Sequence, residues 1–361
     1  MPNILITGGA GFIGKRLALS LRNAGHSVTV FDNLHPQVHP DPEGVIAELK
    51  QAGVRFTHGD VLDGGALTKA IIVAEADIVI HLAAETGTGQ SYDLAVHYCD
   101  VNVTGTARLI EAIRAARTEG VDVSRVILAG SRAIYGEGAC RDVEGREVTA
   151  VPRLSTDLAA GDFAPKDAKG RPLEPIASRA ATTVPAPASI YASTKLMQEY
   201  LLRQGLDQSG VETTILRLQN VYGVGQSLHN PYTGVLSIFA QQLIEGKTLN
   251  IYEDGEIVRD FVYISDVVSA FHRLCELERV PKETVDIGSG KGASIIEVAR
   301  TMIEALGLDG ERLTISGQFR PGDVRFAVAN ISAAERVLGW TPQVSLSDGI
   351  GALVHWARET E

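Results

Sequence analysis

Residues 3–14 read Asn3-Ile4-Leu5-Ile6-Thr7-Gly8-Gly9-Ala10-Gly11-Phe12-Ile13-Gly14, an apolar run that leads directly into a glycine-rich turn. The run is typical of a buried strand, and Leu17, Leu21 and Ala24 beyond the turn have helical spacing. Glycines between a strand and a helix permit a tight turn and close approach of a pyrophosphate to the helix N-terminus. The spacing G-x-x-G-x-x-G differs from G-x-G-x-x-G, so a purely structural turn is the alternative interpretation.

The alternation of short apolar runs and amphipathic stretches continues beyond this turn. Strands are predicted at 28–31, 55–58, 78–82 and 126–129, and a helix at 107–116. Strands that are apolar on both faces and separated by helices favour a parallel sheet covered by helices. The predicted fold class is therefore α/β, a Rossmann-type doubly wound parallel sheet with a smaller mixed α/β substrate-binding lobe.

The domain organisation follows from where this rhythm breaks. Residues 1–222 are predicted to form a dinucleotide-binding Rossmann domain, interrupted by an insertion at about 138–187 that lacks a sustained apolar period. Helices are predicted at 190–208, 236–245 and 295–306, with a strand near 284–287 that returns to the first domain. Residues 223–361 are predicted to form mostly the substrate-binding lobe.

Composition excludes several classes of protein. The 361 residues contain 33 Lys plus Arg and 44 Asp plus Glu, and a net charge of −11 argues against a nucleic-acid partner. No apolar run approaches the ~18 residues of a membrane span, so no membrane association is expected. The sequence lacks a secretion signal, and its 3 cysteines are far apart, which favours a reducing cytoplasm.

Two carboxylates follow predicted strands. Asp32 ends the second strand, where it can accept hydrogen bonds from ribose hydroxyls and repel a 2′-phosphate, which favours NAD over NADP. Asp60 follows the third strand, within reach of an adenine amino group. His35 and His39 have ligand-like spacing, but a proline follows each and no ligand cluster lies nearby. They are interpreted as loop residues beyond the ribose site, and no metal site is predicted.

A second group of residues carries acid–base chemistry. Tyr191 and Lys195 are four residues apart, so they share one helix face, and the ammonium can lower the pKa of the phenol. Ser131 follows the strand at 126–129, at the strand end where α/β sheets bind ligands. An ordinary exposed Tyr–Lys pair is the alternative.

Together these motifs resemble the extended short-chain dehydrogenase/reductases of the NAD-dependent nucleotide-sugar epimerase/dehydratase family, over essentially the whole chain. The glycine turn, Asp32, the segment from His81 to Ala84, and Ser131 with Tyr191 and Lys195 carry the resemblance. The resemblance implies that NAD is bound by Gly8, Gly11, Phe12, Ile13, Gly14, Asp32, Asn33, Asp60, Val61, Leu82, Ala83, Ala84, Thr86, Asn102, Tyr191 and Lys195.

The resemblance also implies a nucleotide-diphosphate sugar as the substrate. Arg259 and Arg320 match the two arginines that hold the diphosphate in this family, and guanidinium binds phosphate through paired hydrogen bonds. The implied catalytic residues are Ser131, Tyr191 and Lys195. The implied substrate contacts are Thr86, Ser131, Arg132, Tyr191, Asn220, Val235, Tyr252, Arg259 and Arg320.

Within the family, the residues after Ser131 distinguish activities. Similar dehydratases carry an Asp-Glu pair where this chain has Arg132-Ala133, so dehydration is disfavoured. The expected activity is an NAD-dependent 4-epimerase of a dTDP- or UDP-hexose, acting by transient oxidation at C4 and return of hydride to the opposite face. The alternatives are a keto-sugar reductase or a decarboxylase of the same fold, and a non-catalytic NAD-sensing protein, against which the intact catalytic residues argue.

Residues 85–91, residues 32–39 and the insertion are most similar to dTDP-L-rhamnose 4-epimerase-like proteins, so dTDP-L-rhamnose and 6-deoxy-L-talose are one candidate pair. The insertion of that group often carries Cys-x-x-Cys pairs, whereas Cys140 stands alone here and cannot form a tetrahedral zinc site. The resemblance further implies a homodimer that pairs through helices at 94–117 and 193–208.

Overall fold

The apolar run at the start of the sequence forms an interior strand, β1 (Asn3–Thr7), in the computed structural model. The structure describes residues 1–228, 234–308, 312–320 and 322–360. β1 pairs in parallel with β2 (Ser27–Asp32) along one edge and with β4 (Ile78–His81) along the other. Ile4, Leu5 and Ile6 are fully buried, as expected of a strand with covered faces.

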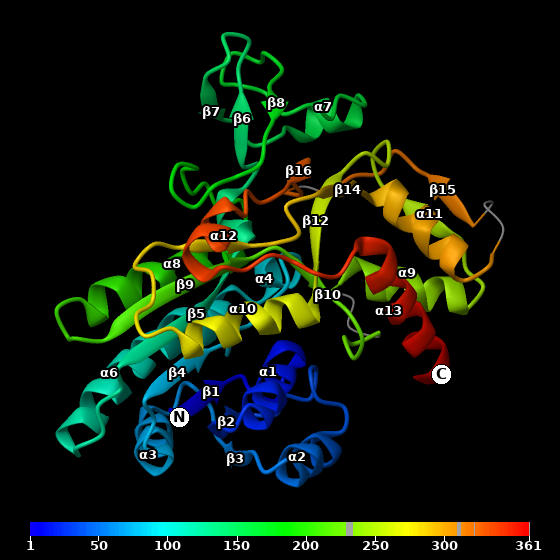
Figure 1. Ribbon diagram of the computed structural model, residues 1–361. Helices are drawn as coiled ribbons and strands as arrows, with labels where there is room; N and C mark the ends of the chain where they lie inside the picture. The colour runs from blue at the N-terminus through cyan, green and yellow to red at the C-terminus, as the bar shows by residue number, and fades with distance from the viewer. Residues whose placement is uncertain (229–233, 309–311, 321, 361) are drawn as a thin grey trace. The chain divides into compact units, whose positions relative to one another are not determined.

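β1 belongs to a seven-stranded sheet with the order β13-β9-β5-β4-β1-β2-β3 (Figure 1). The four pairs between β3 and β5 are parallel. The chain runs outward from β1 to β3 and then returns to β4 on the other side, which makes β1 and β4 the switch point of a doubly wound sheet. The α/β prediction is confirmed. The remaining strands are β3 (Arg55–His58), β5 (Arg125–Ser131), β9 (Glu212–Leu218) and β13 (Val285–Ile287).

Helices pack on this sheet through apolar stripes. α3 (Gly64–Ala74), α6 (Gly105–Thr118) and α8 (Ile190–Leu206) share one hydrophobic cluster with β1, β4 and β5. α1 (Phe12–Asn23) contacts β1 and β2 and buries Leu17 and Leu21, the residues whose spacing predicted it. α2 (Pro42–Gln51) contacts β3, and two further helices are α4 (Gln90–Asp93) and α10 (Ile264–Glu276).

The helix predicted at 94–117 is not a uniform α-helix. It consists of α5 (Ala95–Tyr98), a π-helical segment (Cys99–Thr104) and α6. A π-turn inserts an extra residue into the helical repeat and is found mostly at functional positions. The apolar periodicity of the sequence cannot reveal this, because the flanking α-helical turns keep their own spacing. The buried side chain of Asn102 lies in the π-helical segment.

The segment 138–187 contains short elements joined by loops. β6 (Ala139–Arg141), β7 (Glu147–Thr149) and β8 (Glu174–Pro175) form an antiparallel sheet in the order β7-β6-β8, and α7 (Ser155–Ala159) follows β7. Cys140 is fully buried there, and burial raises the pKa of its thiol to about 11. The cysteine is therefore a core residue of the insertion rather than a reactive thiol.

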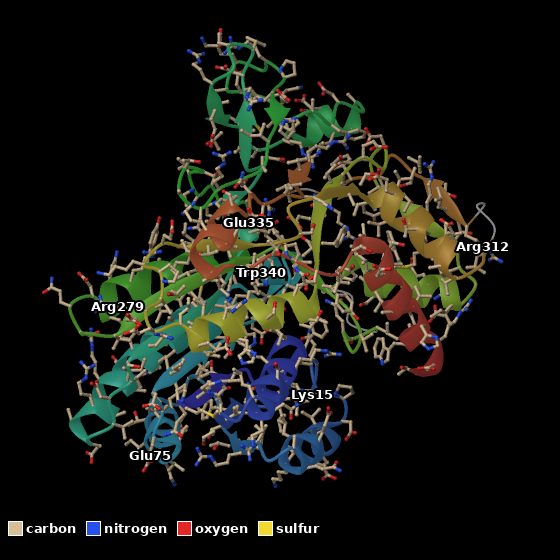
Figure 2. All side chains as sticks on the ribbon, in the orientation of Figure 1. Lys15, Glu75, Arg279, Arg312, Glu335 and Trp340 are labelled. Carbon is tan, nitrogen blue, oxygen red and sulfur yellow. The ribbon has the colours of Figure 1, made fainter. Side chains whose placement is uncertain are left out.

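The C-terminal segments form smaller sheets and a helical layer. β10 (Asn220–Tyr222), β12 (Val258–Tyr263), β14 (Gly292–Ser294) and β16 (Phe326–Ala327) form one sheet, and β11 (Leu249–Ile251) pairs with β15 (Leu313–Ile315). α9 (Val235–Ile244), α11 (Ile295–Ala305) and α13 (Leu346–Thr360) share a hydrophobic cluster. Trp340, labelled in Figure 2, follows α12 (Ser332–Leu338) and donates its indole N–H to the carbonyl oxygen of Asp266 at 3.0 Å.

Contacts divide the chain into two compact units. The first contains Met1–Ser131, Ser193–Arg217 and Val268–Val285, and the second contains Arg132–Ala192, Leu218–Val267 and Asp286–Glu361. The domain boundary near residue 222 stays a prediction. No helix in the described parts of the chain has both the length and the apolar character that a membrane crossing needs.

One buried ion pair in the first unit yields a prediction about stability. Arg217 donates Nε–H and Nη2–H to the two carboxylate oxygens of Glu199, at 2.9 and 2.7 Å, and both side chains are buried. Glu199→Ala leaves the guanidinium buried without its carboxylate, and we expect a loss of about 3–5 kcal/mol in the free energy of unfolding. Urea unfolding measures this loss. Glu111→Ala, which breaks an exposed pair with Arg108, is the control, and equal midpoints for the two variants would contradict the prediction.

Candidate active site

The turn after β1 is closed so tightly that two of its positions exclude any side chain. Gly8 has a φ of +67°, and a Cβ atom there would lie 2.6 Å from the backbone nitrogen of Ala83. A Cβ atom at Gly14 would lie 2.5 Å from the carbonyl oxygen of Gly8. α1 begins at Phe12 with Gly11 as its N-cap, so Gly14 lies in the first turn of the helix. The turn thus presents bare backbone and a helix N-terminus, which fits the pyrophosphate of a dinucleotide.

Asp32, the last residue of β2, is held beside this turn. Its Oδ2 accepts the N–H of Ala10 at 3.0 Å, and its Oδ1 accepts the N–H of Leu34 at 2.8 Å. The Nε2 of His39 lies 3.5 Å from Oδ1, and this histidine, predicted to be a loop residue, is buried against the carboxylate. These contacts fix the orientation of the acid at the strand end where we predict that it meets the ribose.

Asp60 lies at the end of the neighbouring strand β3 and is joined to the same region. Its Oδ2 accepts the Nδ2–H of Asn33 at 3.0 Å, and its Oδ1 accepts the N–H of Leu62 at 2.9 Å. Val61, the residue between Asp60 and Leu62, is buried. The carboxylates of Asp32 and Asp60 are therefore each oriented by short polar contacts at the carboxyl ends of adjacent strands.

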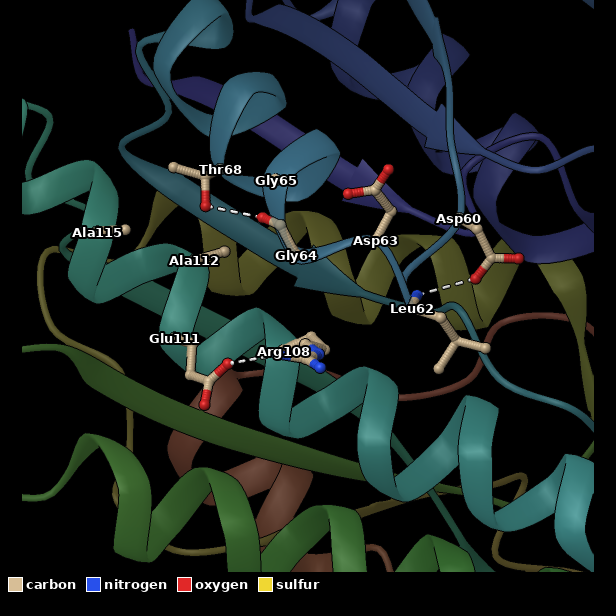
Figure 3. Close-up of a pocket in the computed structure, with 10 residues that line it drawn as sticks. All are labelled: Asp60, Leu62, Asp63, Gly64, Gly65, Thr68, Arg108, Glu111, Ala112 and Ala115. Atoms are coloured by element: carbon tan, nitrogen blue, oxygen red, sulfur yellow. Dashed lines mark hydrogen bonds and ion pairs between the residues drawn. The ribbon is translucent and has the colours of Figure 1, made fainter.

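A hollow of about 770 Å³ opens between α3 and α6 (Figure 3). It is lined by Asp60, Leu62, Asp63, Gly64, Gly65, Thr68, Arg108, Glu111, Ala112 and Ala115. Of these residues, Asp60 is the one predicted to bind the cofactor. Arg108 donates a hydrogen bond to Glu111, which lies one turn further along α6. The hollow therefore borders the predicted adenine position and is distinct from the glycine turn.

The segment after β4 is fixed to its neighbours by backbone and side-chain contacts. Leu82 donates its N–H to the carbonyl oxygen of Thr7 at 3.0 Å, which carries the chain past the glycine turn to Ala83 and Ala84. The carbonyl oxygen of Thr86 accepts the hydroxyl of Tyr98 at 2.6 Å. Leu82 and Ala83 therefore lie beside the glycine turn.

Asn102 connects this segment to α8. Its Oδ1 accepts the N–H of Glu85 at 2.7 Å, and its Nδ2 donates to the carbonyl oxygen of Glu85 at 3.1 Å and to the hydroxyl of Thr194 at 2.9 Å. An amide has two N–H donors, and both are used here. Asn102, predicted to bind the cofactor, thus orients the polypeptide segments around it.

The ammonium of Lys195 is buried. The residue is 4% exposed, and Nζ donates to the Oε1 of Gln198 at 2.5 Å. Burial lowers the pKa of Lys195 to about 8, and the charge of Glu199 opposes this shift. The neutral amide of Gln198 does not offset this effect of burial.

A neutral hydrogen-bond network holds Gln198 in place. Its Nε2 donates to the hydroxyl of Thr106 at 2.9 Å, and that hydroxyl donates to the carbonyl oxygen of Asn102 at 2.6 Å. The Nε2 of His81 lies 3.1 Å from the Thr106 oxygen, and its Nδ1 lies 2.7 Å from the hydroxyl of Thr7. Because the Thr106 hydroxyl already donates, we assign the His81 proton to Nε2. Burial lowers the pKa of His81 to about 3, so the ring stays neutral.

The predicted catalytic hydroxyls occupy the ends of two elements. Ser131 is the last residue of β5, and Tyr191 is the second residue of α8. Tyr191 and Lys195 are separated by one helical turn, so they share a face of α8. The elements that the sequence predicted to carry these residues are present at the predicted places.

In the second unit, Arg259 of β12 has an acidic partner. Its Nη2 donates to the Oδ1 of Asp323 at 2.6 Å, and its Nη1 donates to the carbonyl oxygen of Val258 at 2.8 Å. Arg132 donates from Nη2 to the carbonyl oxygen of Gly136 at 3.0 Å. Burial, together with the charge of Arg259, lowers the pKa of Arg132 to about 10. The charges of Glu137 and Asp323 oppose this shift, so the two guanidinium groups lie in an environment that also contains carboxylates.

Arg320 lies over the ring of Tyr252, with its guanidinium carbon 4.9 Å from the ring centroid, as in a cation–π contact. Both residues line a cavity of about 540 Å³, which is lined by Ala159, Tyr252, Ser316, Gly317, Gln318, Phe319 and Arg320. Pro321, next in the predicted motif, lies outside the described residues. Asn220 is in β10, which pairs with β12, and Val235 begins α9.

The structure adds residues that sequence reasoning missed. Gln198 holds Lys195, Thr106 holds Gln198, and Asp323 holds Arg259. The spacing of Gln198 three residues after Lys195 was a usable signal, because such residues meet on a helix. The other contacts join segments distant in sequence. Within the described ranges, no group of three or more His, Cys, Asp or Glu side chains is arranged to hold a metal ion.

Comparisons with known proteins agree with this geometry. Residues 4–288 match the model of the NAD dependent epimerase/dehydratase family. The chain belongs to this family, and it is an enzyme whose cofactor is NAD, as the sequence predicted. The carboxylate of Asp32 and the bare glycine turn fit that cofactor.

Individual relatives cover almost the whole chain. The dTDP-L-rhamnose 4-epimerase of Burkholderia thailandensis is 42% identical, over 98% of this chain and 94% of its own. The structure of UDP-glucose 4-epimerase from Thermotoga maritima with UDP-glucose is 29% identical, with a TM-score of 0.78 and 99% of each chain covered. UDP-glucuronic acid 4-epimerase from Bacillus cereus, in complex with UDP-glucuronic acid and NAD, is 25% identical with the same TM-score of 0.78 and the same coverage of 99% of each chain.

The position of Asp32 yields a prediction about the cofactor. Asp32→Ala removes a charged hydrogen-bond partner of the ribose, so NAD affinity should fall roughly ten- to a hundredfold and discrimination against NADP should decline. Titration of the protein with each cofactor measures both effects. Asp122→Ala, at an exposed carboxylate paired with Arg117, is the control. A wild-type preference for NADP would show that the role given to Asp32 is wrong.

Proposed function

We propose that this enzyme is a nucleotide-sugar 4-epimerase that acts on a dTDP- or UDP-hexose. The curated relative at 42% identity carries that activity on dTDP-L-rhamnose, and the two solved relatives above are 4-epimerases named for UDP-sugars. Arg132 and Ala133 occupy the positions at which an acid pair would support dehydration. dTDP-L-rhamnose and 6-deoxy-L-talose are the substrate pair that we favour, because the 42% identity extends over 98% of the chain.

The observation that carries the proposal is the arrangement on α8. Tyr191 and Lys195 share one helix face, and the Lys195 ammonium is buried and held by a neutral amide. A buried positive charge one helical turn from a phenol stabilises the phenolate. A phenolate that forms near neutral pH is a general base for a sugar hydroxyl.

In the mechanism that we propose, the glycine turn and Asp32 would hold NAD, which would supply reversible hydride transfer at C4 of the sugar, with return to the opposite face. Tyr191 removes the proton from the C4 hydroxyl and later gives it back. Ser131 donates a hydrogen bond to the C4 oxygen, and Lys195 binds the nicotinamide ribose. Arg259 and Arg320 hold the diphosphate, so the sugar can rotate while the nucleotide stays anchored.

The experiment that tests the proposed function uses the purified protein and a panel of dTDP-, UDP- and GDP-sugars without added cofactor. A C4 stereoisomer formed without reductant is the expected result, because an epimerase regenerates NAD in each cycle. A keto-sugar reductase would consume NADH and form no isomer. Tight NAD binding with no turnover of any sugar would favour the non-catalytic alternative.

Tyr191→Phe tests the assignment of the base. The variant removes the hydroxyl that transfers the proton but keeps the ring, so we expect kcat to fall about 10²- to 10⁴-fold with substrate binding largely unchanged. Steady-state kinetics and calorimetric binding of the sugar nucleotide measure the two effects. Tyr200→Phe, at an exposed tyrosine of the same helix, is the control. Near-normal kcat in Tyr191→Phe would rule out the phenol as the base.

We also propose a cytoplasmic homodimer. Val96 of α5 is 75% exposed, and Met197 and Tyr200 of α8 are 44% and 46% exposed, on the two helical regions predicted to pair. An interface between subunits would cover these exposed apolar side chains. Sedimentation at micromolar concentration should give the mass of two chains, and the mass of one chain would contradict the proposal.

A further inference from the structure

The insertion buries an arginine among acidic groups of the second unit. Arg153 lies between β7 and α7, and its side chain is only 3% exposed. Its Nε donates to the Oε1 of Glu137 at 3.0 Å, and its Nη1 donates to the Oε2 of Glu253 at 3.0 Å. Both carboxylates are buried as well. A buried guanidinium needs such partners, and here they come from segments about a hundred residues apart.

One branch of this cluster leads to Arg259. The Nη2 of Arg153 donates to the backbone carbonyl oxygen of Asp323 at 2.9 Å. The Oδ1 of Asp323 in turn accepts the Nη2–H of Arg259 at 2.6 Å and the N–H of Val324 at 2.9 Å. Arg153 thus fixes the main chain of the residue whose side chain orients Arg259.

The other branch leads to the cavity that contains Arg320. Glu253 follows Tyr252, over whose ring the Arg320 guanidinium lies. The backbone of Glu253 has a φ of +51°, a left-handed conformation that is unfavourable for a residue with a Cβ. Its carboxylate accepts hydrogen bonds from Arg153 and from the Nη1 of Arg325, the latter at 2.9 Å. Arg153 and Arg325 therefore hold Glu253, and with it Tyr252, in a conformation that the chain alone does not favour.

We propose that Arg153 is a positioning residue through which the insertion orients Arg259 and Arg320 for the diphosphate of a nucleoside-diphosphate substrate. This inference rests on the proposed function, in which the two arginines hold that group. A guanidinium is required because three partners at different angles accept from its planar fork, and an ammonium cannot match that geometry.

The test compares Arg153→Met and Arg153→Lys in the NAD-bound protein, with dTDP and UDP as calorimetric probes. We expect the diphosphate to bind about ten- to a hundredfold more weakly to the Met variant, by analogy with the removal of groups that orient a ligand-binding residue. The Lys variant keeps the buried charge, so it should fold normally and show a smaller loss. KM should rise more than kcat falls, because the anchoring contact is made in ground and transition states alike.

Two controls separate positioning from general damage. Arg171→Met alters an arginine of the same insertion whose partner, Asp167, is on the surface, and it should bind dTDP like the wild type. Thermal unfolding and NAD content are measured for every variant. Loss of the buried cation is expected to lower the unfolding temperature of the Met variant, so weak dTDP binding with NAD retained, at a temperature where the variant is still folded, supports a local effect.

Arg259→Ala distinguishes failure of this inference from failure of the proposed function. If Arg259→Ala leaves dTDP affinity unchanged, the diphosphate is held elsewhere and the proposed anchoring is wrong. If Arg259→Ala weakens dTDP binding while both Arg153 variants match the wild type, the positioning role is wrong. In the double variant Arg153→Met, Arg259→Ala, the loss of dTDP affinity should be smaller than the product of the two single losses. The reason is that Arg153 acts mainly through Arg259, which the double variant lacks. Fully multiplicative losses in affinity would also overturn the inference.

Discussion

The close approach of the first turn to the neighbouring strand is the constraint on which the first unit depends. Gly8 touches the backbone at Ala83 so closely that any Cβ atom would collide, and Gly14 does the same with Gly8. Because these contacts join β1, α1 and the end of β4, they fix the helix N-terminus at the switch point of the sheet. The same backbone supplies the N–H of Ala10 to the Asp32 carboxylate. The turn that closes the fold is therefore also the cradle that fits NAD.

The buried cations of this protein differ in their partners, and the difference follows their roles. Arg217 is matched by both oxygens of Glu199, which makes it a structural pair. Lys195 is held by the neutral amide of Gln198, so burial lowers its pKa to about 8. A carboxylate as the hydrogen-bond partner would instead stabilise the charged form. The choice of partner is therefore part of the reason why the pKa of Lys195 is lowered, whereas Arg217 has a full counter-charge.

The two units carry different parts of the proposed chemistry. The glycine turn, Asp32, Asp60 and Lys195 belong to the first unit, whereas Arg132, Tyr252, Arg259 and Arg320 belong to the second. Hydride transfer is the cofactor's chemistry, common to the family, so the first unit can stay constant while substrates change. The second unit, with its insertion, is where the recognition of a particular nucleotide sugar is expected to reside. On this view Arg153 gives the insertion a role in binding the nucleotide sugar.

The sequence predicted the elements, the α/β class and the cofactor because each rests on contacts within a few residues. A continuous apolar run identifies β1, helical spacing identifies α1, and turn chemistry requires glycine at Gly8. It did not reveal the π-turn at Asn102, since an extra residue in a helical repeat leaves no composition signal. The sequence also did not identify the partners of buried polar and charged side chains. Thr7 meets His81 across 74 residues, and Glu137 meets the N–H of Arg325 across 188 residues. Such pairs are set by how the chain returns upon itself, so only the tertiary structure decides which neutral or acidic group satisfies each buried polar side chain.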